Sequence, residues 1–470
     1  MKTRIKKNII VSGLLSCCLL FTTGMLSSCD DELDITPKGK TTLETISDLE
    51  SLLNQEWTLE KNPATDLLMV CNEAEGFALN VPGTMGRKNS LVYAYLTYDE
   101  SVDRAAVNVN DYRYEQAYKY INYMNVVISK MPGVSGDEKK KTQCIAEARI
   151  MRAYLHWLLV NIYAKQYDES YADTEGGIIY VDNTDVSGTK PKLTLKETYK
   201  RILEDCSDEV ISQLPEHEPN VERGDQAWGN AVKAKVLMQM KKYSEAIPYA
   251  QASLRLNGNI EDRSLIKTAK KWNLLATCEN NLLYIRHGTR VAPNLEALSK
   301  ESRPLYEDGD YVFNYGGVWD ARKGLLYCGV NVLVFSSYST YCNVYGLTSD
   351  RMYYTLAECL IRTGKIREGL EQVDLVRAKR IENYTPFAKD GLSEKEAMAL
   401  YQRAKWIECI GTFENFFDCK RWNTEKGYER TITKNLDKYG DFTIKPESPL
   451  WIMPFPLTAT RYNPTLTQNY

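Results

Sequence analysis

Two stretches of this chain have the pattern of a helical hairpin, and they constrain its fold more than any other feature. In residues 224–258, small and apolar residues recur at three- and four-residue intervals on both sides of a polar turn at 242–245. Ala234 and Ala246 flank this turn, and residues this small let two helices approach closely. Residues 352–381 repeat the pattern. Because this periodicity belongs to amphipathic helices, we expect a mostly α-helical fold.

The two hairpins have the spacing of tetratricopeptide-like units. Two such units would leave apolar faces uncovered, so other segments must pack on them. Residues 112–131 and 140–163 predict further helices, and the second is apolar on most of its surface, as in a central core helix. Thr194 and Glu197 have the spacing of a capping box, which predicts a helix that ends before Pro215.

The remaining segments are read more coarsely. Residues 41–57 predict an amphipathic helix. From 60 to 105 the periodicity fails and Gly, Pro, Asn and Tyr accumulate, which indicates long loops. Residues 259–350 show little helical period, and within them 281–286 and 329–335 have the composition of short strands,. We therefore expect a helical scaffold with an irregular loop and short-strand region packed on it.

The irregular region 259–350 is rich in aromatic residues, which are Trp272, Tyr306, Tyr311, Phe313, Tyr315, Trp319, Tyr327, Tyr338, Tyr341 and Tyr345. Tyr and Trp present a flat apolar face with a polar edge. Such faces suit sugar rings, whose C–H bonds form an apolar surface surrounded by hydroxyl groups. The alternative is that these side chains are half-buried anchors that tie irregular loops to the helical core.

The N-terminus has the pattern of an export signal. Its basic residues are Lys2, Arg4, Lys6 and Lys7. The apolar segment from Ile9 to about Leu20 is too short to span a membrane and is typical of a signal peptide. Leu26, two serines and Cys29 match a bacterial lipoprotein processing box, which predicts removal of residues 1–28 and lipidation of Cys29. Attached acyl chains would tether the protein to a membrane; the alternative is a cleaved signal with an incidental cysteine.

From Cys29 on, we expect residues 29–40 to form an acidic linker and residues 41–470 to form a single domain. Without residues 1–28 the chain has 55 basic and 62 acidic side chains, a net charge of −7. It therefore lacks the basic stripe that phosphate neutralisation requires, and we expect no nucleic-acid partner.

Cysteine and histidine usage argues against a disulfide frame and against zinc. Beyond Cys29, the cysteines are Cys71, Cys144, Cys206, Cys278, Cys328, Cys342, Cys359, Cys409 and Cys419. Nine cysteines cannot all pair, and their scattered positions on apolar faces predict buried free thiols. The histidines, His156, His217 and His287, have no second ligand type at metal spacing, so no zinc site is expected.

No catalytic signature stands out. The chain has no G-x-S-x-G elbow, H-E-x-x-H pair or Rossmann fingerprint,. Gly39–Lys40–Thr41 imitates the end of a phosphate loop, but Asp34 occupies the position that needs glycine. We therefore expect a binding protein without a cofactor. Carboxylates are plentiful, so a surface glycosidase stays open on residue types alone.

Five motifs in a fixed order carry a resemblance. They are residues 147–154, residues 356–358, the run Phe417–Asn423, Pro454–Phe455–Pro456, and the run Asn463–Asn469. Together with the processing box and the acidic tract, they resemble the SusD/RagB family of Bacteroidetes outer-membrane nutrient-binding lipoproteins. The chain departs from the family pattern at Thr412, Phe413 and Asn415, where an acidic-Gly pair and an Arg are usual. Losing an acidic and a basic residue together costs less stability than losing only one of them, because no buried charge is left unpaired. We therefore expect a repacked core helix and the same fold.

The resemblance implies a lipid-anchored protein on the cell surface that captures oligosaccharide and passes it to a SusC-like TonB-dependent transporter in the outer membrane. It also implies ligand contacts from the loops after the first helix and from the irregular middle. By chemistry the candidates are Asn72, Glu73 and Arg87 as polar hooks, with Tyr95, Tyr98, Tyr311 and Trp319 as stacking faces. Asp308 and Asp310 could offer oxygens to calcium, or form an ordinary acidic turn. Peptide cargo, as for RagB-like proteins, and a scaffold that binds only protein are the alternatives.

Overall fold

A computed structural model describes most of the chain after residue 42. The described residues are 43–55, 57–59, 65–73, 80–185, 188–269, 278–285, 296–316, 318–321, 329–335 and 343–470. Leu43–Tyr470 form one unit by their contacts. The predicted leader 1–28, the lipidation site Cys29 and the acidic linker 29–40 lie outside the described residues.

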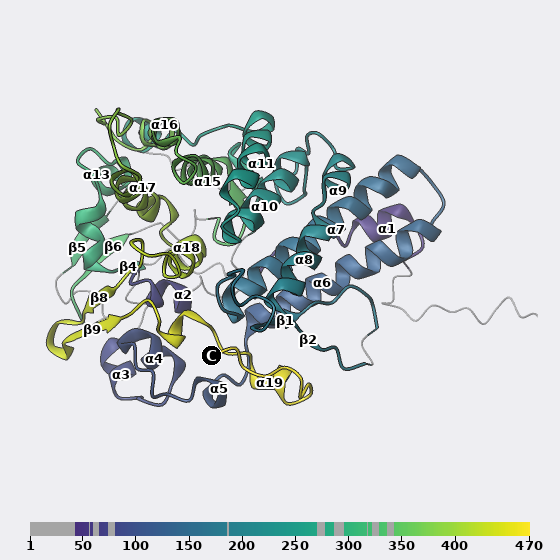
Figure 1. Ribbon diagram of the computed structural model, residues 1–470, viewed down its shortest axis with the longest axis horizontal. Helices are drawn as coiled ribbons and strands as arrows, with labels where there is room; N and C mark the ends of the chain where they lie inside the picture. The colour runs from purple at the N-terminus through teal and green to yellow at the C-terminus, as the bar shows by residue number, and fades with distance from the viewer. Residues whose placement is uncertain are drawn as a thin grey trace, which may run out of the picture. The chain divides into compact units, whose positions relative to one another are not determined.

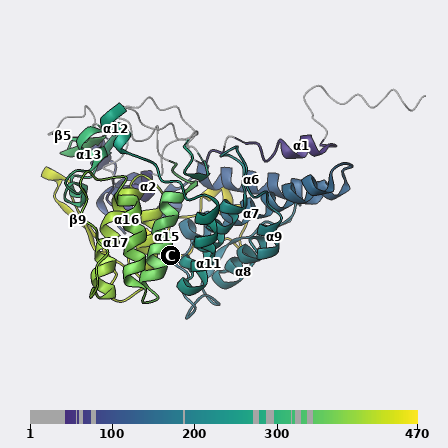
Figure 2. The same ribbon diagram turned by 90° about the horizontal axis from the view of Figure 1, so that it is seen from above.

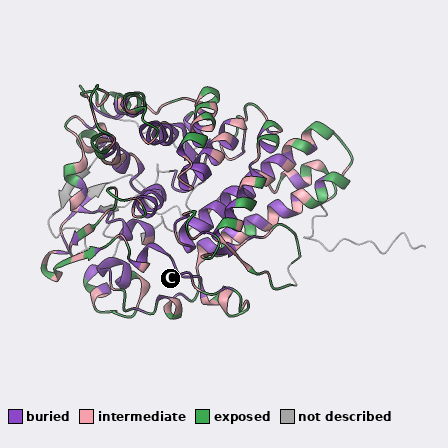
Figure 3. Ribbon diagram, viewed as in Figure 1, coloured by how far each residue is buried: buried purple, intermediate pink, exposed green. Residues whose placement is uncertain are grey.

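Two long helices, α6 (Tyr112–Lys130) and α7 (Glu138–Tyr163), form the centre of the core. The side chains of Asp111 and Asp137 accept hydrogen bonds from N–H groups of the first turns, which would otherwise lack partners,. Helix α7 is buried along nearly all of its second half (Figure 3) and packs against α6 and α8 (Leu195–Asp205). The prediction of a central core helix over 140–163 is confirmed.

Helix α8 begins where the sequence predicts. The Thr194 side chain accepts a hydrogen bond from the N–H of Glu197 at 3.2 Å. The chain leaves the helix after Asp205, and Ser207, in extended conformation, begins the separate helix α9 (Asp208–Ser212). The prediction of one helix up to Pro215 is therefore wrong. Beside α7 and α8, strand β1 (Gly176–Ile179) pairs antiparallel with β2 (Lys192–Thr194).

The two predicted hairpins are both present. Their helices are α10 (Gln226–Gln239) with α11 (Tyr243–Leu256), and α15 (Ser349–Ile361) with α16 (Ile366–Arg377). Gly364, in the second turn, has a φ of 85°, which favours glycine,. Helix α11 packs against α15, so the two hairpins lie side by side (Figures 1 and 2). Helix α17 (Glu394–Cys409) covers α15 and α16.

Helix α18 (Glu414–Trp422) brings charged side chains into the interior. Arg421 donates to both carboxylate oxygens of Glu358, at 2.6 and 2.8 Å, and both side chains are fully buried. Lys405 pairs with Asp418 in the same interior. Although burial raises the pKa of Glu358, the nearby Arg421 charge outweighs it and holds this pKa at about 2.

The beginning of α18 contains the departures from the family pattern. Phe413 and Asn415 are buried. The Phe413 ring lies 4.7 Å from that of Phe417 and stacks on Tyr345. Asn415 donates to the carbonyl of Trp406 at 2.9 Å. As expected, helix α18 is retained. Its start is repacked with an apolar side chain, Phe413, and an amide side chain, Asn415.

Residues 60–105, where the structure describes them, contain short helices, so the prediction of long loops is wrong there. The helices are α2 (Thr65–Val70), α3 (Val81–Met85), α4 (Leu91–Thr97) and α5 (Arg104–Val107). Asn80, Ser90 and Asp103 cap α3, α4 and α5 through their side chains. Helices this short show no periodicity, so for α3, α4 and α5 the capping residues were the sequence signal,. Similarly, α1 spans only Ile46–Glu50 instead of 41–57.

The region 259–350 is irregular, as predicted. Its described elements are α12 (Ser264–Ala269), β3 (Asn281–Leu283), β4 (Glu296–Leu298), the 3₁₀ helix η4 (Lys300–Leu305), α13 (Tyr311–Tyr315), β5 (Val318–Ala321), β6 (Val332–Phe335) and β7 (Leu347–Thr348). Strand β6 pairs antiparallel with both β4 and β5, and β3 pairs with β7. Both predicted strand segments are confirmed, as β3 and β6. Figure 2 shows α12, α13 and β5 at one end of helices α15–α17.

The last part of the chain returns to the central helix. Strands β8 (Ile432–Asn435) and β9 (Asp441–Ile444) form a hairpin, and two further elements follow, the 3₁₀ helix η6 (Pro449–Trp451) and α19 (Leu457–Thr460). Asn469 Nδ2 donates to the carbonyls of Tyr163 and Gly177 at 2.9 and 2.8 Å. Asn469 thereby supplies a partner to the last residue of α7.

The cysteines described by the structure are free and buried, namely Cys71, Cys144, Cys206, Cys278, Cys359, Cys409 and Cys419. The prediction of buried free thiols is confirmed for these residues, while Cys328 and Cys342 lie outside the described part of the chain. Within the described ranges, no helix has the length and apolar character needed to span a bilayer.

Replacing Glu358 by alanine should destabilise the fold by about 3–5 kcal/mol, because Arg421 would be left buried without its counter-charge. The free energy of unfolding, measured by urea titration, checks this. Glu368→Ala is the matched control, since Glu368 on α16 is exposed and only loosely paired with Lys365, and it should change stability by less than about 0.5 kcal/mol. Equal stability of Glu358→Ala and wild type would contradict the role given to this ion pair.

Candidate functional site

The loop after α2 and the irregular middle of the chain meet against the β8–β9 hairpin. The Asn72 side chain donates to Glu301 at 3.4 Å, and Glu301 accepts from the N–H of Asn435 at 3.2 Å. The N–H of Ser299 donates to the carbonyl of Glu73 at 2.9 Å. We call these five residues the polar junction. It joins the two segments from which the resemblance implies ligand contacts.

The outer side of the polar junction is half-buried and charged. The Lys300 ammonium binds Asn435 at 2.7 Å and Asp437 at 2.6 Å. Asp437 also accepts a hydrogen bond from the N–H of Asn331, at the start of the segment that leads into β6. Gly329 lies so close to Pro82 of α3 that a Cβ would meet the proline ring at 2.6 Å. The irregular middle therefore contacts both α3 and the β8–β9 hairpin.

Glu73 is buried at the inner end of the polar junction. Its Oε2 accepts from the N–H of Gly411 at 2.7 Å, while Oε1 has no hydrogen-bond partner. Burial raises the pKa of Glu73 to about 8, against the hydrogen bonds from Gly411 and Asn415 that favour the charged form. Glu73 is therefore mostly protonated at neutral pH.

Tyr95 and Tyr98 on and after α4 are core residues, with 2% and 7% of their surfaces exposed. The Tyr98 hydroxyl donates to the carbonyls of Met69 and Val70, and the Lys434 ammonium lies 4.6 Å from its ring centroid. This burial corrects the expectation that the two rings offer stacking faces. Asn72 and Glu73 are also interior residues, and these four side chains hold together the loops that they were expected to line.

Two other candidates, Arg87 and Tyr311, are nearer the surface. Arg87 is exposed between α3 and α4, where its Nε donates to the carbonyl of Gly83 at 3.3 Å. Tyr311 is half-buried at the start of α13. Trp319 lies on β5, where it pairs with Val334 of β6. Its side chain is not among those that the structure describes. The structure does not show these residues in one continuous site.

The possible calcium ligands Asp308 and Asp310 have different environments. Asp308 is exposed, while Asp310 is buried and caps α13 by accepting from the N–H of Phe313 at 2.9 Å. Burial raises the pKa of Asp310 to about 6. In the described part of the chain, no group of three or more His, Cys, Asp or Glu side chains is arranged to hold a metal ion. This geometry favours the acidic turn over the calcium site.

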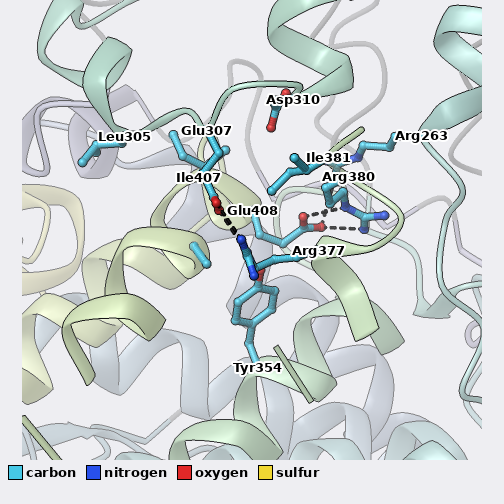
Figure 4. Close-up of a pocket in the computed structure, with 11 residues that line it drawn as sticks. Arg263, Leu305, Glu307, Asp310, Tyr354, Arg377, Arg380, Ile381, Ile407 and Glu408 are labelled. Atoms are coloured by element: carbon cyan, nitrogen blue, oxygen red, sulfur yellow. Dashed lines mark hydrogen bonds and ion pairs between the residues drawn. The ribbon is translucent and has the colours of Figure 1, made fainter. Parts of the chain in front are cut away.

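Asp310 also lines a small cavity of about 20 Å³ among paired charges (Figure 4). Arg380 donates to Glu408 at 2.8 and 2.9 Å, and Arg377 donates to Glu307 at 3.0 and 2.6 Å. The cavity has room for about one water molecule. The Arg377–Glu307 pair connects the irregular region to α16, and Arg263, which binds Glu408 at 3.1 Å, connects it to α17, so this cluster is an anchor and not a ligand site.

An open groove of about 480 Å³ lies between α6, the segment after β1 and the segment around α19. Tyr114, Tyr118 and Tyr462 contribute aromatic rings to it, and Tyr462 is 78% exposed. Glu115 and Lys190 add charged groups to the lining. We call this the tyrosine groove; aromatic faces among polar groups suit a sugar ring.

Sequence reasoning missed the tyrosine groove. Tyr114 belongs to the apolar stripe of α6, and Tyr462 lies just before the tail motif. Only the pairing of segments distant in sequence brings them together.

The comparisons with known proteins agree with this architecture. Residues 32–226 match the SusD-like family model described as "Starch-binding associating with outer membrane". A SusD superfamily protein from Bacteroides thetaiotaomicron superposes with a TM-score of 0.69 at 16% identity, covering 91% of this chain and all of that one. A SusD-like carbohydrate binding protein from Bacteroides vulgatus gives a TM-score of 0.65 at 13% identity, covering 90% and 97%. A search of curated proteins gave no match.

The chain has the SusD fold, and the resemblance predicted from its motifs is confirmed. A SusD superfamily protein from Bacteroides fragilis shows the same architecture, with a TM-score of 0.66 at 18% identity over 90% of this chain and 99% of that one. At these identities the solved structures establish the fold alone.

Glu73→Gln should flatten the pH dependence of stability. In wild type, between the ordinary carboxyl pKa of 4.5 and the raised value of about 8, the folded state keeps a proton that the unfolded state releases. Stability should therefore fall as pH rises through this window, by up to about 1.4 kcal/mol per pH unit. Glutamine stays neutral, so the variant should gain on wild type as pH rises. Urea unfolding from about pH 5 to about pH 8 measures this.

The matched control is Glu279→Gln, because Glu279 is exposed. It should keep the slope of wild type. A Glu73→Gln variant with the same slope as wild type would show that the Glu73 carboxyl is ionised in the folded protein.

Proposed function

We propose that this protein is a cell-surface glycan-binding lipoprotein that captures oligosaccharide and delivers it to a SusC-like TonB-dependent transporter of the outer membrane. The observation that carries the proposal is the SusD fold over nine-tenths of the chain. Two further observations support it: the description of the family model that matches residues 32–226, and the carbohydrate binding stated for the Bacteroides vulgatus protein.

The lipoprotein part of the proposal rests on the processing box at Leu26–Cys29. Acyl chains on Cys29 would anchor the protein in the membrane, since each buried CH₂ contributes about 0.8 kcal/mol. The acidic linker 29–40 would then separate the membrane from the helical unit. Mass spectrometry of the purified protein should find the acylated Cys29 at its N-terminus.

For the glycan contacts we propose Arg87 and Tyr311, which are not core residues, together with Trp319 on β5. Arg87 and the β4–β6–β5 sheet belong to the segments that meet around the polar junction, where α3 contacts Gly329. A guanidinium can donate to sugar hydroxyls, and an indole ring can stack on a sugar ring. The buried members of the junction would hold these loops in place.

A delivery protein must release its cargo. We therefore propose micromolar or weaker affinity, which corresponds to about −8 kcal/mol or less in magnitude. Such binding requires no catalytic group. In the described chain, the acidic side chains Glu73, Asp310 and Asp350, whose pKa values burial raises, are interior residues that accept hydrogen bonds from the protein itself.

Trp319→Ala and Arg87→Ala should each weaken binding of the preferred oligosaccharide by tenfold or more, because each removes a direct contact. A glycan array on the purified protein identifies the ligand, and calorimetry measures the affinities. Arg255→Ala is the matched control for Arg87, since Arg255 is exposed at the end of α11, and it should bind as wild type does.

Other outcomes would favour the alternatives. New reducing ends after incubation with glycans would support a surface glycosidase and contradict the binding-only proposal. Binding of peptides without binding of glycans would support RagB-like peptide uptake. A response to neither, with capture of protein partners alone, would support a protein-binding scaffold.

A further inference from the structure

The tyrosine groove is separate from the residues proposed above for glycan contacts. Its lining comes from α6, the segment after β1 and the segment around α19, and it includes none of Arg87, Tyr311 and Trp319. Its volume of about 480 Å³ lies within the range of about 300–1,000 Å³ that is usual for small-molecule sites,. The groove is therefore large enough to hold a ligand of its own.

Tyr462 presents an aromatic face to solvent at the groove. It is 78% exposed, more than any other large hydrophobic residue in the described part of the chain. Val109, which is 55% exposed, belongs to the same surface, because its carbonyl accepts from the N–H of the lining residue Thr458 at 3.2 Å. Neighbouring exposed apolar groups with polar groups around them are typical of a place where a protein binds a ligand.

Two more tyrosine rings line the inner side of the groove. Tyr114 is 7% exposed and Tyr118 is half-buried, and their ring centroids are 4.7 Å apart. The Tyr118 hydroxyl donates to the carbonyl of Ile179 at 2.8 Å, and the Tyr114 ring packs edge-on against Tyr163 at 5.4 Å. These contacts fix both rings before a ligand arrives, so binding would cost little side-chain entropy.

The C-terminal tail motif holds a further wall of the groove in place. Asn463 Nδ2 donates to the carbonyl of Lys190 at 2.7 Å. Further along, Lys192 Nζ donates to Asn469 Oδ1 at 2.8 Å. The segment that carries Lys190 is thus tied to the tail at two points. A motif on which the family resemblance rests therefore gives this wall a fixed geometry.

The polar groups of the lining suit a neutral ligand. Glu115 is exposed on α6 and, among the described residues, takes part in no ion pair, so its carboxylate is open to hydroxyl donors,. Lys190 Nζ donates to Asn183 Oδ1 at 2.8 Å, which leaves two of its three protons for other acceptors,. Thr189 and Thr458, both exposed, add hydroxyl groups. Charges of both signs disfavour an ion of either sign and favour a molecule rich in hydroxyl groups.

We propose that the tyrosine groove is a second saccharide-binding site, which takes a neutral sugar unit of an oligosaccharide. The C–H face of the sugar ring lies on the Tyr462 ring. Its hydroxyl groups donate to Glu115 and accept from Lys190. The inference goes beyond the glycan contacts proposed at Arg87 and Trp319 and does not depend on them.

A glycan array tests the groove apart from the first site. The double variant Arg87→Ala/Trp319→Ala removes two contacts of the first site and should keep binding neutral glycans through the groove. Adding Tyr462→Ala to it should weaken the remaining binding by about tenfold or more, because the sugar loses its stacking face. Absence of binding in the double variant, or remaining binding that Tyr462→Ala leaves unchanged, overturns the proposal.

Two further variants of Tyr462 and its surroundings separate stacking from general effects. Tyr462→Phe keeps the ring and should bind as the double variant does. Leu375→Ala is the matched control, since Leu375 on α16 is 49% exposed and lies outside the groove. It should also leave binding unchanged. A loss of binding in Leu375→Ala equal to that in Tyr462→Ala would contradict a specific contact at Tyr462.

Glu115→Ala should weaken binding at the groove by about threefold or more, because the sugar hydroxyls lose a charged acceptor. Glu209→Ala is its control, since Glu209 is exposed on α9 and lies outside the groove. It should bind as the double variant does. Unchanged binding by Glu115→Ala would contradict the hydrogen bonds assigned to this carboxylate.

Calorimetry on the double variant tests the class of ligand. We expect the neutral oligosaccharide that gives the strongest array signal to bind. Choline is the second probe, because tyrosine rings beside a carboxylate can also bind a quaternary ammonium ion; it should not displace the oligosaccharide. Displacement by choline, or an array response to acidic glycans alone, would show an ion site and overturn the proposal.

The two sites can fail independently. Full binding by Arg87→Ala/Trp319→Ala together with loss of binding by Tyr462→Ala would support the groove and contradict the first site. Loss of binding by the double variant together with full binding by Tyr462→Ala would contradict the groove and support the first site.

Discussion

The structure depends on the pairing of charges inside the helical scaffold. Glu358, Arg421, Lys405 and Asp418 come from three different helices, and each would be costly to bury without its partner,. Sliding or rotating α18 against α15 and α17 would separate these buried charges. The ion pairs make such movements unfavourable, and they help to hold a helix as short as α18 in the interior, where all of its residues are buried.

The same principle fixes the irregular region to this scaffold. Arg263 and Glu307 of the irregular region pair with Glu408 and Arg377 around the small cavity of Figure 4, and the polar junction connects the other side to the β8–β9 hairpin. Segments with few regular hydrogen bonds are thus held by side chains at both ends. A rigid frame with irregular segments on it suits recognition, because such segments can change in sequence while the frame stays the same.

The sequence predicted the parts of the fold that repeat locally. Periodicity predicted the hairpins α10–α11 and α15–α16 and the central helix α7, since apolar residues three and four positions apart form the faces along which these helices pack. The short helices α2 to α5 have too few residues for such a pattern. The site was predicted less well: Glu73 looks the same in sequence whether it faces solvent or interior. Its environment depends on Gly411, 338 residues away, and no local pattern records that contact.

The contact that Asn469 makes with the central helix can form only late in synthesis of the chain. It binds the carbonyl of Tyr163, 306 residues earlier, so the end of the central helix lacks this partner until Asn469 has been synthesised. Contacts between such distant residues form late, because a long loop must close first. The core consequently stays incomplete until nearly the whole polypeptide has been made.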